Sequence, residues 1–413
     1  MTLDLVPFDA ARAAVLGACV TLEADHIPLE SASGRVLAET LHAREDIVPY
    51  ARSAMDGFAL RAADTAAGVS LTVTGSAFAG SPALQPSGEP MELSVGTAAA
   101  IATGAPLPAG ADAVVPIEDV QRRNGAIVLG SVLAAGEHVF PAGDDARAGD
   151  VLASAGSVLD PGTLAYLAAA GFSTAACTRK PAVALITTGD EVVAVEATPG
   201  FGQVRNSNAT LLVATLAGAG ATIAYRRHIR DDRDALRAAL RDAVASGDLA
   251  ITTGGASVGE RDYMKALLEE LGATFLFRSV ALRPGRPIAF ALLGGVPVLV
   301  LPGNPASAFT GLHGFGLPAL RKLEGQVAPL PYRTRARLRG DLHGKSDKTF
   351  LAFCALGVAS DGVLDARPLD NQCSALTRTA AEAKGFAVVE PERGDVRDGE
   401  FLDVEFFARS ALA

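Results

Sequence analysis

The chain has 413 residues, which is too long for one ordinary hydrophobic core and indicates about two to four domains. Its formal net charge is −10. An acidic balance of this size argues against a general nucleic-acid binder, because such proteins present a basic face. It does not exclude a small anionic ligand, since a local cluster of arginines can override the overall charge.

The cysteines and the N-terminus bear on the compartment. Cys19, Cys177, Cys354 and Cys373 are widely separated, and no Cys-x-x-Cys or His-x-x-x-His pair occurs, so we expect free thiols rather than structural zinc or a disulfide framework. The first residues lack the charged and apolar regions of a signal peptide. No apolar run reaches the roughly 18 residues that span a bilayer. We therefore expect a cytoplasmic protein that does not bind a membrane.

The N-terminal part of the chain predicts a helical segment. We expect the first forty residues to be helical, and Phe8 opens an amphipathic stretch with Val15, Leu16 and Cys19 on its apolar side. Helical character returns after residue 144, in the run 161–167. We expect residues 1–43 and 144–178 to form one N-terminal helical domain.

Between these two stretches the sequence changes character. Short β-type runs, such as 71–74 and 126–129, alternate with glycine and proline turns. This pattern predicts a small β-rich domain of residues 44–143 inserted into the helical one.

Residues 179–326 alternate strands with helices. Apolar strands are expected at 182–187, 249–252 and 296–301, and helices at 208–216, 234–244, 263–271 and 306–323. Strands that alternate with helices of this length form a parallel sheet with crossover helices. The last segment, 327–413, returns to β runs at 386–389 and 401–404 and predicts a small β-barrel, with a sandwich as the alternative. The fold class is therefore multidomain α/β.

Three strand ends in the α/β segment carry polar or glycine-rich loops, at 187–191, 253–262 and 301–307. Ligands of open α/β sheets bind beyond the carboxyl ends of the strands. Each loop alone is weak evidence, because a glycine-rich turn is more often only a turn. Three of them at successive strand ends predict a binding site.

The residues of these loops suit a phosphorylated ligand and a divalent cation. The glycines Gly254, Gly255 and Gly259, with Ser257, fit a phosphate cradle, since a backbone without side chains can approach an anion closely. Asp190, Glu191 and Asp262 offer the carboxylate oxygens that Mg²⁺ prefers. Helix capping is the alternative role for Asp190 and Glu191.

The same loops resemble the molybdopterin-binding domain of molybdenum-cofactor biosynthesis. The matching segments are Thr-Thr-Gly-Asp-Glu (187–191), Gly-Gly-Ala-Ser-Val-Gly-Glu-Arg-Asp-Tyr (254–263) and Leu-Pro-Gly-Asn-Pro-Ala-Ser (301–307). Outside that domain, segments 53–59, 101–108, 112–116 and 141–145 resemble the molybdopterin molybdenumtransferases. The resemblance covers nearly the whole chain. It implies an elongated homodimer that inserts molybdate into adenylylated molybdopterin with release of AMP.

In that family the active site lies in a cleft between two subunits, and the resemblance implies roles for the matching residues. We expect the following residues to be catalytic: Asp56, Thr103 and Asp145 from one subunit, and Glu191, Asp231 and Asp262 from the other. Asp190, Glu191 and Asp262 are the expected Mg²⁺ ligands. The expected binding residues are Thr188, Gly189, Asp190, Gly254, Gly255, Ser257, Gly259, Arg283, Arg286, Pro302, Gly303, Asn304 and Ser374. Without the resemblance, Asp56 and Thr103 would be assigned to turns beside Gly57 and Gly104.

The molybdate pocket departs from the family pattern. Arg283 and Arg286 stand where relatives usually carry at least one Lys, and they flank a Pro-Gly turn. Two cations there suit a dianion, although a guanidinium contacts an anion with different geometry from an ammonium. The alternative is a solvated turn. Lys348 replaces an Arg common in the family, and Ser374 matches a serine of the C-terminal domain.

Two other functions are open at this point. The preceding step, adenylylation of molybdopterin, uses a similar α/β domain but needs none of the first 180 or so residues. A non-catalytic carrier would bind the pterin nucleotide without releasing AMP. The adenylyltransferase and the acceptor molybdoenzymes are the expected protein partners.

Overall fold

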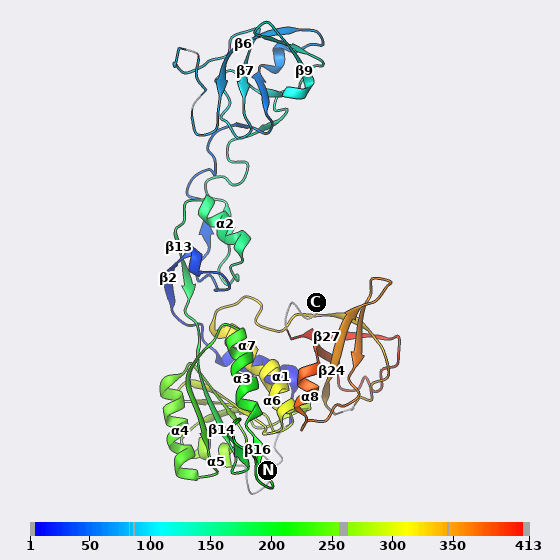
Figure 1. Cartoon of the computed structure of the whole chain (residues 1–413). Helices are drawn as coiled ribbons and strands as arrows, with labels where there is room; N and C mark the ends of the chain where they lie inside the picture. Colours follow the sequence, from blue (N-terminus) through cyan, green and yellow to red (C-terminus); the bar gives the residue numbers. More distant parts are fainter. Residues whose placement is uncertain (1–4, 82, 86, 256–262, 345–346, 408–413) are drawn as a thin grey trace.

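The structure is a computed structural model, and it describes residues 5–81, 83–85, 87–255, 263–344 and 347–407. The molecule is elongated (Figure 1). A β-rich body lies at one end, a small body containing α2 lies in the middle, and the α/β body with the C-terminal strands lies at the other end. No helix in the described part of the chain combines the length and apolar character that a membrane crossing requires.

The β-rich body is a six-stranded sheet built from residues 57–129. Its strands, in spatial order, are β8 (Ala113–Pro116), β5 (Gly57–Leu60), β7 (Thr97–Ile101), β6 (Ser70–Ala77), β10 (Ala126–Leu129) and β9 (Val120–Arg123). Alternate residues such as Leu71, Ile127 and Leu129 are buried, as the period of a half-buried strand requires. Two short 3₁₀ helices, Ala62–Asp64 and Ile117–Asp119, connect strands at the edge.

The middle body is small and contains the single helix α2 (Pro161–Ala169). Asp160 caps this helix, because its side chain accepts a hydrogen bond from the backbone N–H of Thr163. Three two-stranded ladders and a 3₁₀ turn, Leu29–Ser31, complete it. The ladders pair β2 (Ala24–Pro28) with β13 (Thr174–Thr178), β3 (Leu41–His42) with β12 (Val151–Ala153), and β4 (Arg52–Ser53) with β11 (Val139–Phe140).

The α/β body contains a second six-stranded sheet. Its spatial order is β17 (Thr222–Ile229), β14 (Ala182–Thr188), β18 (Leu249–Thr253), β22 (Val296–Leu301), β21 (Ala289–Leu293) and β19 (Thr274–Phe277). The first four strands are parallel, as expected, but β21 runs antiparallel to β22 and to β19. The exception has a local cause: Gly294 and Gly295 both adopt positive φ and form a two-residue hairpin turn.

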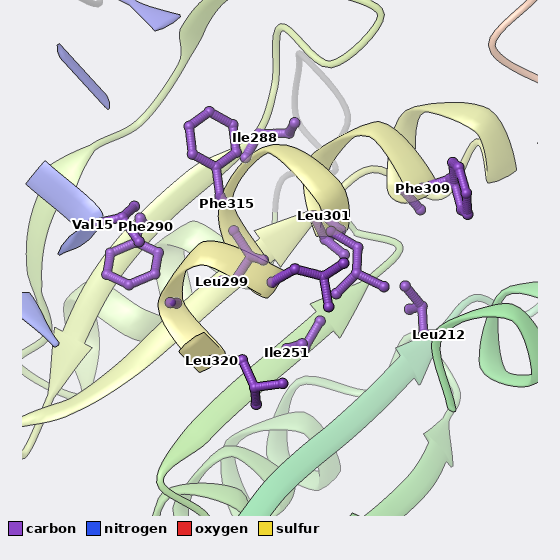
Figure 2. Packing of buried hydrophobic residues seen from close by; sticks show 14 of the residues in the cluster. Val15, Leu212, Ile251, Ile288, Phe290, Leu299, Leu301, Phe309, Phe315 and Leu320 are labelled. Carbon is purple, nitrogen blue, oxygen red and sulfur yellow. The ribbon is translucent and has the colours of Figure 1, made fainter. Parts of the chain in front are cut away.

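Helices cover both faces of this sheet. On one face, α4 (Arg233–Ser246) and α5 (Tyr263–Glu270) bury Leu236, Leu240 and Leu267 against the strands. On the other face, α3 (Ser207–Gly218), α6 (Pro305–Gly311) and α7 (Leu317–Leu323) enclose a large apolar cluster (Figure 2). We expected one helix at 306–323. The structure joins α6 and α7 through a π-helical turn, Leu312–Gly316.

The N-terminal helix differs from expectation in length and place. The helix α1 (Phe8–Ala18) is 11 residues long, and residues 24–28 form a strand rather than a continuation of the helix. We expected it to pack with residues 144–178. Instead Phe8 and Val15 belong to the apolar cluster of the α/β body. Its buried residues are spaced by three, four and seven positions, and the helix contacts α7.

The C-terminal strands form a small closed barrel, as expected. The ring is β24 (Thr349–Val358), β25 (Leu364–Pro368), β23 (Arg333–Leu338), β27 (Phe401–Phe406) and β26 (Gly385–Val389), and β26 pairs back with β24. The strands β20 (Val280–Arg283) and β1 (Val6–Pro7) extend the sheet beside β24. The short helix α8 (Thr377–Glu382) packs between the barrel and α6.

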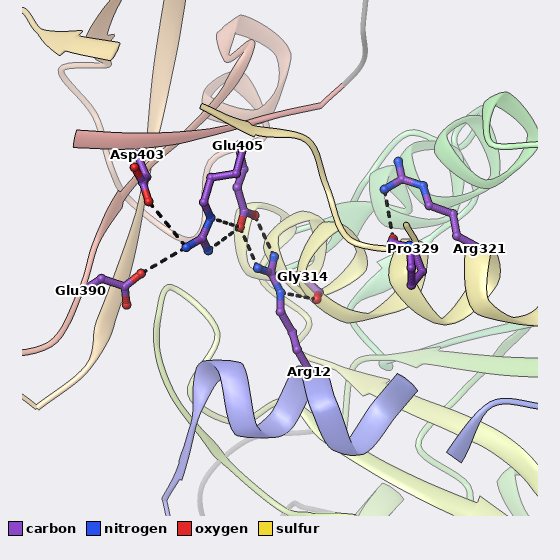
Figure 3. A network of polar contacts seen from close by, with 8 residues as sticks. Arg12, Gly314, Arg321, Pro329, Glu390, Asp403 and Glu405 are labelled. Carbon is purple, nitrogen blue, oxygen red and sulfur yellow. Dashed lines mark hydrogen bonds and ion pairs between the residues drawn. The ribbon is translucent and has the colours of Figure 1, made fainter. Parts of the chain in front are cut away.

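A buried ionic network joins the N-terminal helix to the barrel (Figure 3). Both guanidinium nitrogens of Arg12 donate to the Glu405 carboxylate, at 2.6 and 2.7 Å, and Arg12 Nε donates to the carbonyl of Gly314. Arg333 donates to the same carboxylate at 2.7 Å. Arg12 and Glu405 are only 4% and 3% exposed. Burying the pair is tolerated because the charges are mutually satisfied.

Candidate functional site

The described parts of the three polar loops predicted from the sequence lie side by side. They follow β14, β18 and β22, which are adjacent and parallel, so that their carboxyl ends lie at one edge of the sheet. A cleft of about 740 Å³ lies at this edge. It is lined by residues of all three loops, by the start of α3, by the short strands β15 (Val192–Val193) and β16 (Val204–Arg205), and by Ala375 and Thr377 before and in α8.

Seven of the expected residues line the cleft: Thr188, Glu191, Gly254, Gly255, Pro302, Gly303 and Asn304. Glycine is required at position 254, because the backbone adopts φ +98° there and a Cβ atom would lie 2.3 Å from the carbonyl oxygen of Thr188. The amide nitrogen of Gly254 donates to the carbonyl of Leu301 at 3.3 Å. The second loop is therefore packed against the backbone of both the first and the third loop, and Gly254 and Gly255 line the cleft.

The carboxylates around the first loop have different surroundings. The carboxylate of Glu191, on the cleft wall, folds back over Gly189. The Asp190 carboxylate, which is exposed, accepts from Arg230 Nε at 2.9 Å, and this contact lowers the pKa of Asp190. Asp231 Oδ1 accepts from the hydroxyl of Thr188 at 2.9 Å. Of these three residues, Glu191 is the one that lines the cleft.

The cleft suits a divalent cation that is bound by only one or two protein ligands. Within the described ranges, no group of three or more His, Cys, Asp or Glu side chains could hold a metal. Mg²⁺ in phosphate-binding sites commonly takes one or two carboxylates, with water and phosphate oxygens for the rest. Glu191 supplies one such carboxylate. Three expected residues, Ser257, Gly259 and Asp262, lie outside the described residues.

The two arginines expected to bind an anion do not line the cleft in this structure. Arg283 ends β20, and its guanidinium lies over the ring of Phe350, 4.3 Å from the centroid. Arg286 is exposed, in the turn that follows. That turn reaches the cleft through Pro287, which lines it. Lys348 forms an ion pair with Asp347 at 2.9 Å.

Ser374 connects the cleft to the barrel domain. Its hydroxyl accepts from Asn304 Nδ2 at 3.2 Å, and its carbonyl accepts from the backbone N–H of Ala306 at 3.0 Å. The neighbouring Ala375 lines the cleft. The segment that precedes α8 therefore lies against the N-terminal end of α6. Through this contact the C-terminal part of the chain reaches the cleft.

The other three expected catalytic residues lie outside the α/β body of the same chain. Asp56 Oδ1 accepts from the backbone N–H of Thr103 at 2.8 Å and from its hydroxyl at 3.1 Å. This pair belongs to the β-rich body, at the opposite end of the molecule (Figure 1). Asp145 lies 3.7 Å from Arg52 in an ion pair. The structure thus brings Asp56 and Thr103 together but separates both from Glu191.

Several cleft residues were not predicted. The main ones are Asn206, Asn208 and Thr253, together with Pro287, Ala375 and Thr377. Asn206 caps α3, because its Oδ1 accepts from the backbone N–H of Ala209. An Asn-Ser-Asn segment before an apolar helix is a signal for a cap. Nothing in it indicates that the second asparagine reaches two other loops.

Comparisons with known proteins agree with the geometry. Residues 6–171 match the family described as the MoeA N-terminal region (domain I and II), residues 184–322 the probable molybdopterin binding domain, and residues 335–407 the MoeA C-terminal region (domain IV). Molybdopterin molybdenumtransferase of Bacillus subtilis is 34% identical over 377 residues, which cover 89% of this chain and 86% of the relative. The Haemophilus influenzae protein of the same name is 30% identical over 93% of this chain and 94% of its own.

A solved structure shows the same architecture. The molybdopterin biosynthesis MoeA protein from Pyrococcus horikosii superposes with a TM-score of 0.80 at 30% identity, covering 98% of this chain and 100% of its own. All three segments of the family are present in order, and the relatives match over nearly the full length. The chain therefore belongs to the molybdopterin molybdenumtransferase family.

Proposed function

We propose that this protein inserts molybdate into adenylylated molybdopterin and releases AMP, which gives the molybdenum cofactor. The observation that carries the proposal is the cleft at the ends of β14, β18 and β22, in a chain of this family. The bare backbone at Gly254 and Gly255 suits the phosphates. The N-terminal ends of α3 and α6 both lie at the cleft and favour negative charge.

We propose that Mg²⁺ is held by Glu191 with Asp190 and Asp262. When bound, the ion neutralises charge on the phosphates and polarises them. Glu191 already lies on the cleft wall, whereas Asp190 would exchange its exposed contact with Arg230 for the ion. The protein's own contribution is to position the substrate and to compensate charge, and no covalent nucleophile is needed.

We also propose that the active protein is a homodimer with composite sites. Asp56, Thr103 and Asp145 match the family's catalytic positions, yet in one chain the first two lie at the far end from the cleft (Figure 1). Exposed apolar side chains along residues 50–158, including Tyr50, Phe140 and Val151, offer a surface that a second subunit can cover. We propose 44–143, 179–326 and 327–413 as three of the domains, and 1–43 with 144–178 as the fourth, except for α1, which packs in the α/β body. Cytoplasmic location and contact with the adenylyltransferase and acceptor enzymes stay predictions.

The test is AMP release. Protein incubated with adenylylated molybdopterin, molybdate and Mg²⁺ should release AMP, and chelation of Mg²⁺ should stop the release. Glu191→Gln removes a charge from an exposed loop, so we expect a higher Mg²⁺ requirement with an unchanged unfolding midpoint. Tight binding of the pterin nucleotide without AMP release would contradict the proposal and indicate a carrier.

A further inference from the structure

One side chain of the cleft connects three segments that are distant in the sequence. Asn208 lies in the first turn of α3. Its Nδ2 donates to Thr253 Oγ1 at 3.1 Å and to the carbonyl of Gly303 at 2.8 Å. Thr253 in turn donates its hydroxyl proton to the carbonyl of Pro302 at 2.8 Å. The start of α3, the end of β18 and the loop after β22 are thereby joined by three hydrogen bonds.

The chemistry of the neighbours fixes the orientation of the amide. The Thr253 hydroxyl donates its only proton to the Pro302 carbonyl, so toward Asn208 its oxygen can act only as an acceptor. The Gly303 carbonyl can also only accept. Both neighbours therefore require the NH₂ group, and a carboxylate in its place would face two acceptors. Asparagine is thus selected here by hydrogen bonding and not by shape.

This arrangement is not explained by helix stability. Asn206, two residues earlier, already caps α3. The remaining oxygen of Asn208, Oδ1, is buried and has no hydrogen-bond partner among the described residues. Buried polar atoms without partners are rare in native proteins and carry a free-energy cost. A residue whose only role was to stabilise the helix would not require a buried oxygen without a hydrogen-bond partner.

We propose that Asn208, acting through Thr253, is a positioning residue that sets the spacing between the Gly254–Gly255 loop and the Pro302–Asn304 loop. Both loops line the cleft on either side of this network. The neighbouring backbone bond, from the Gly254 N–H to the carbonyl of Leu301 at the end of β22, is long at 3.3 Å. The identity of the ligand rests on the function proposed above. The role of Asn208 in spacing the two loops does not depend on that function.

Amide hydrogen exchange tests the spacing without any substrate. We expect peptides that cover 253–255 and 301–304 to exchange about tenfold faster in Asn208→Ala and in Thr253→Val, because each variant removes the hydrogen bonds that restrain the loops. Thr253→Ser keeps the hydroxyl and should exchange like the parent. Thr215→Val is the matched control. It removes a threonine hydroxyl bonded to the Leu211 carbonyl in the same helix, outside the cleft lining.

Steady-state kinetics of AMP release test the consequence. We expect Asn208→Ala and Thr253→Val each to raise KM for the pterin nucleotide about tenfold, the factor that one typical net hydrogen bond represents, with a smaller change in kcat. The double variant should be no worse than the poorer single variant, since both break one network. Thr253→Ser should restore KM, and Thr215→Val should leave it unchanged.

The outcomes separate the two proposals. Unchanged exchange in both loops of Asn208→Ala and Thr253→Val would overturn the positioning role, as would independent effects that multiply in the double variant. If Asn208→Ala fails to fold, the Thr253→Val and Thr253→Ser pair still decides. If the variants change hydrogen exchange as expected but the parent protein never releases AMP, the result would support the positioning role and contradict the proposed function.

Discussion

Glu405 holds two arginines at once, and its surroundings fix its charge. Burial alone would raise the pKa of Glu405, but hydrogen bonds from Arg12 and Arg333 outweigh burial and hold the pKa below its usual value. Arg12 also lies over the ring of Phe8, 4.1 Å from the centroid. The carboxylate is therefore ionised in the folded protein and links α1 to β27.

We predict that Glu405→Gln lowers the free energy of unfolding by about 3–5 kcal/mol, because it leaves the buried guanidinium of Arg12 without a counter-charge. Chemical denaturation at neutral pH measures this. The matched control is Glu390→Gln, since Glu390 is 45% exposed and contacts only the outer side of Arg333 at 3.5 Å. Its cost should stay within about 0.5 kcal/mol. Equal losses in the two variants would contradict the role given to burial.

Arg286 is the arginine that is free to meet an anion in the turn beside the cleft, whereas the guanidinium of Arg283 is stacked on Phe350. We predict that Arg286→Gln raises the molybdate concentration for half-maximal cofactor formation about tenfold to hundredfold, as loss of a charge-assisted bond implies. Arg286→Lys keeps the charge and should be mild. If the Gln variant matches the parent, the anion site must be sought near Lys348 and Ser374.

Residues of the candidate site differ in how visible they are in the sequence. Gly254, Gly255 and Pro302 were predicted because loop composition and strand ends are local features. Asn208 was not, because its partners lie 45 and 95 residues away and nothing local distinguishes it from a helix-capping residue. The opposite case is Arg283: its charge is visible in the sequence, but its stacking on Phe350 depends on the pairing of β20 with β24.

At the scale of elements, long periodic segments were predicted well and short ones were not. The strands β14, β18 and β22 and the helices α3 and α4 lie where apolar runs and helical spacing indicated. The two-residue strands and the π-helical turn were missed, because they arise from packing and not from local pattern. In that turn, His313 is enclosed by aromatic rings, with its ring centroid 4.3 Å from that of Phe309 and 4.6 Å from that of Phe407.

This enclosure predicts a pH dependence of stability. Burial, with a smaller contribution from the charge of Arg321, lowers the pKa of His313 from 6.5 to about 3. Between these values the unfolded chain binds the proton and the folded protein does not, so His313 stabilises the fold above pH 6.5 and this contribution is lost as the pH falls. The expected slope is about 1.4 kcal/mol per pH unit.

The measurement is the free energy of unfolding at several pH values between 4.5 and 6.5, a range that lies above the depressed pKa of Glu405. His313→Phe replaces the imidazole by a ring that cannot titrate. This variant should lower the slope of the unfolding free energy against pH by the contribution of about one proton, whatever its effect on the absolute stability. An unchanged slope in this variant would show that other groups cause the acid sensitivity.

At the scale of the whole molecule, the elongated shape separates the two halves of the expected active site. Asp56 and Thr103 form one cluster in the β-rich body, and Glu191 lies on the cleft of the α/β body. Figure 1 shows these bodies at opposite ends of the subunit. Two subunits side by side would bring unlike ends together, and closed twofold symmetry would then create two equivalent sites.

This arrangement predicts complementation. Homodimers of Asp56→Ala and of Glu191→Ala should each have little AMP-release activity. A heterodimer of the two, isolated with two different tags, should recover about half of the parental activity, because one of its two sites carries both intact residues. The control is a heterodimer of Asp56→Ala with Thr103→Ala, which share one half-site and should not recover. Absence of recovery in the first pair would contradict composite sites.

The contact between α1 and the barrel also has a consequence for synthesis of the chain. Arg12 emerges from the ribosome early, but its partner Glu405 lies 393 residues later. At about 5–20 residues per second, the helix waits for roughly 20–80 seconds before its counter-charge appears. During that time Phe8 and Val15 also lack the rest of their apolar cluster, since its buried members after Cys19 begin at Val183. All strand pairings of the β-rich sheet lie within residues 57–129, so this sheet can fold in the interval. The N-terminal helix is therefore made before the rest of the α/β body and waits for partners that come much later in the chain, so it is open to chaperones and proteases on a nascent chain.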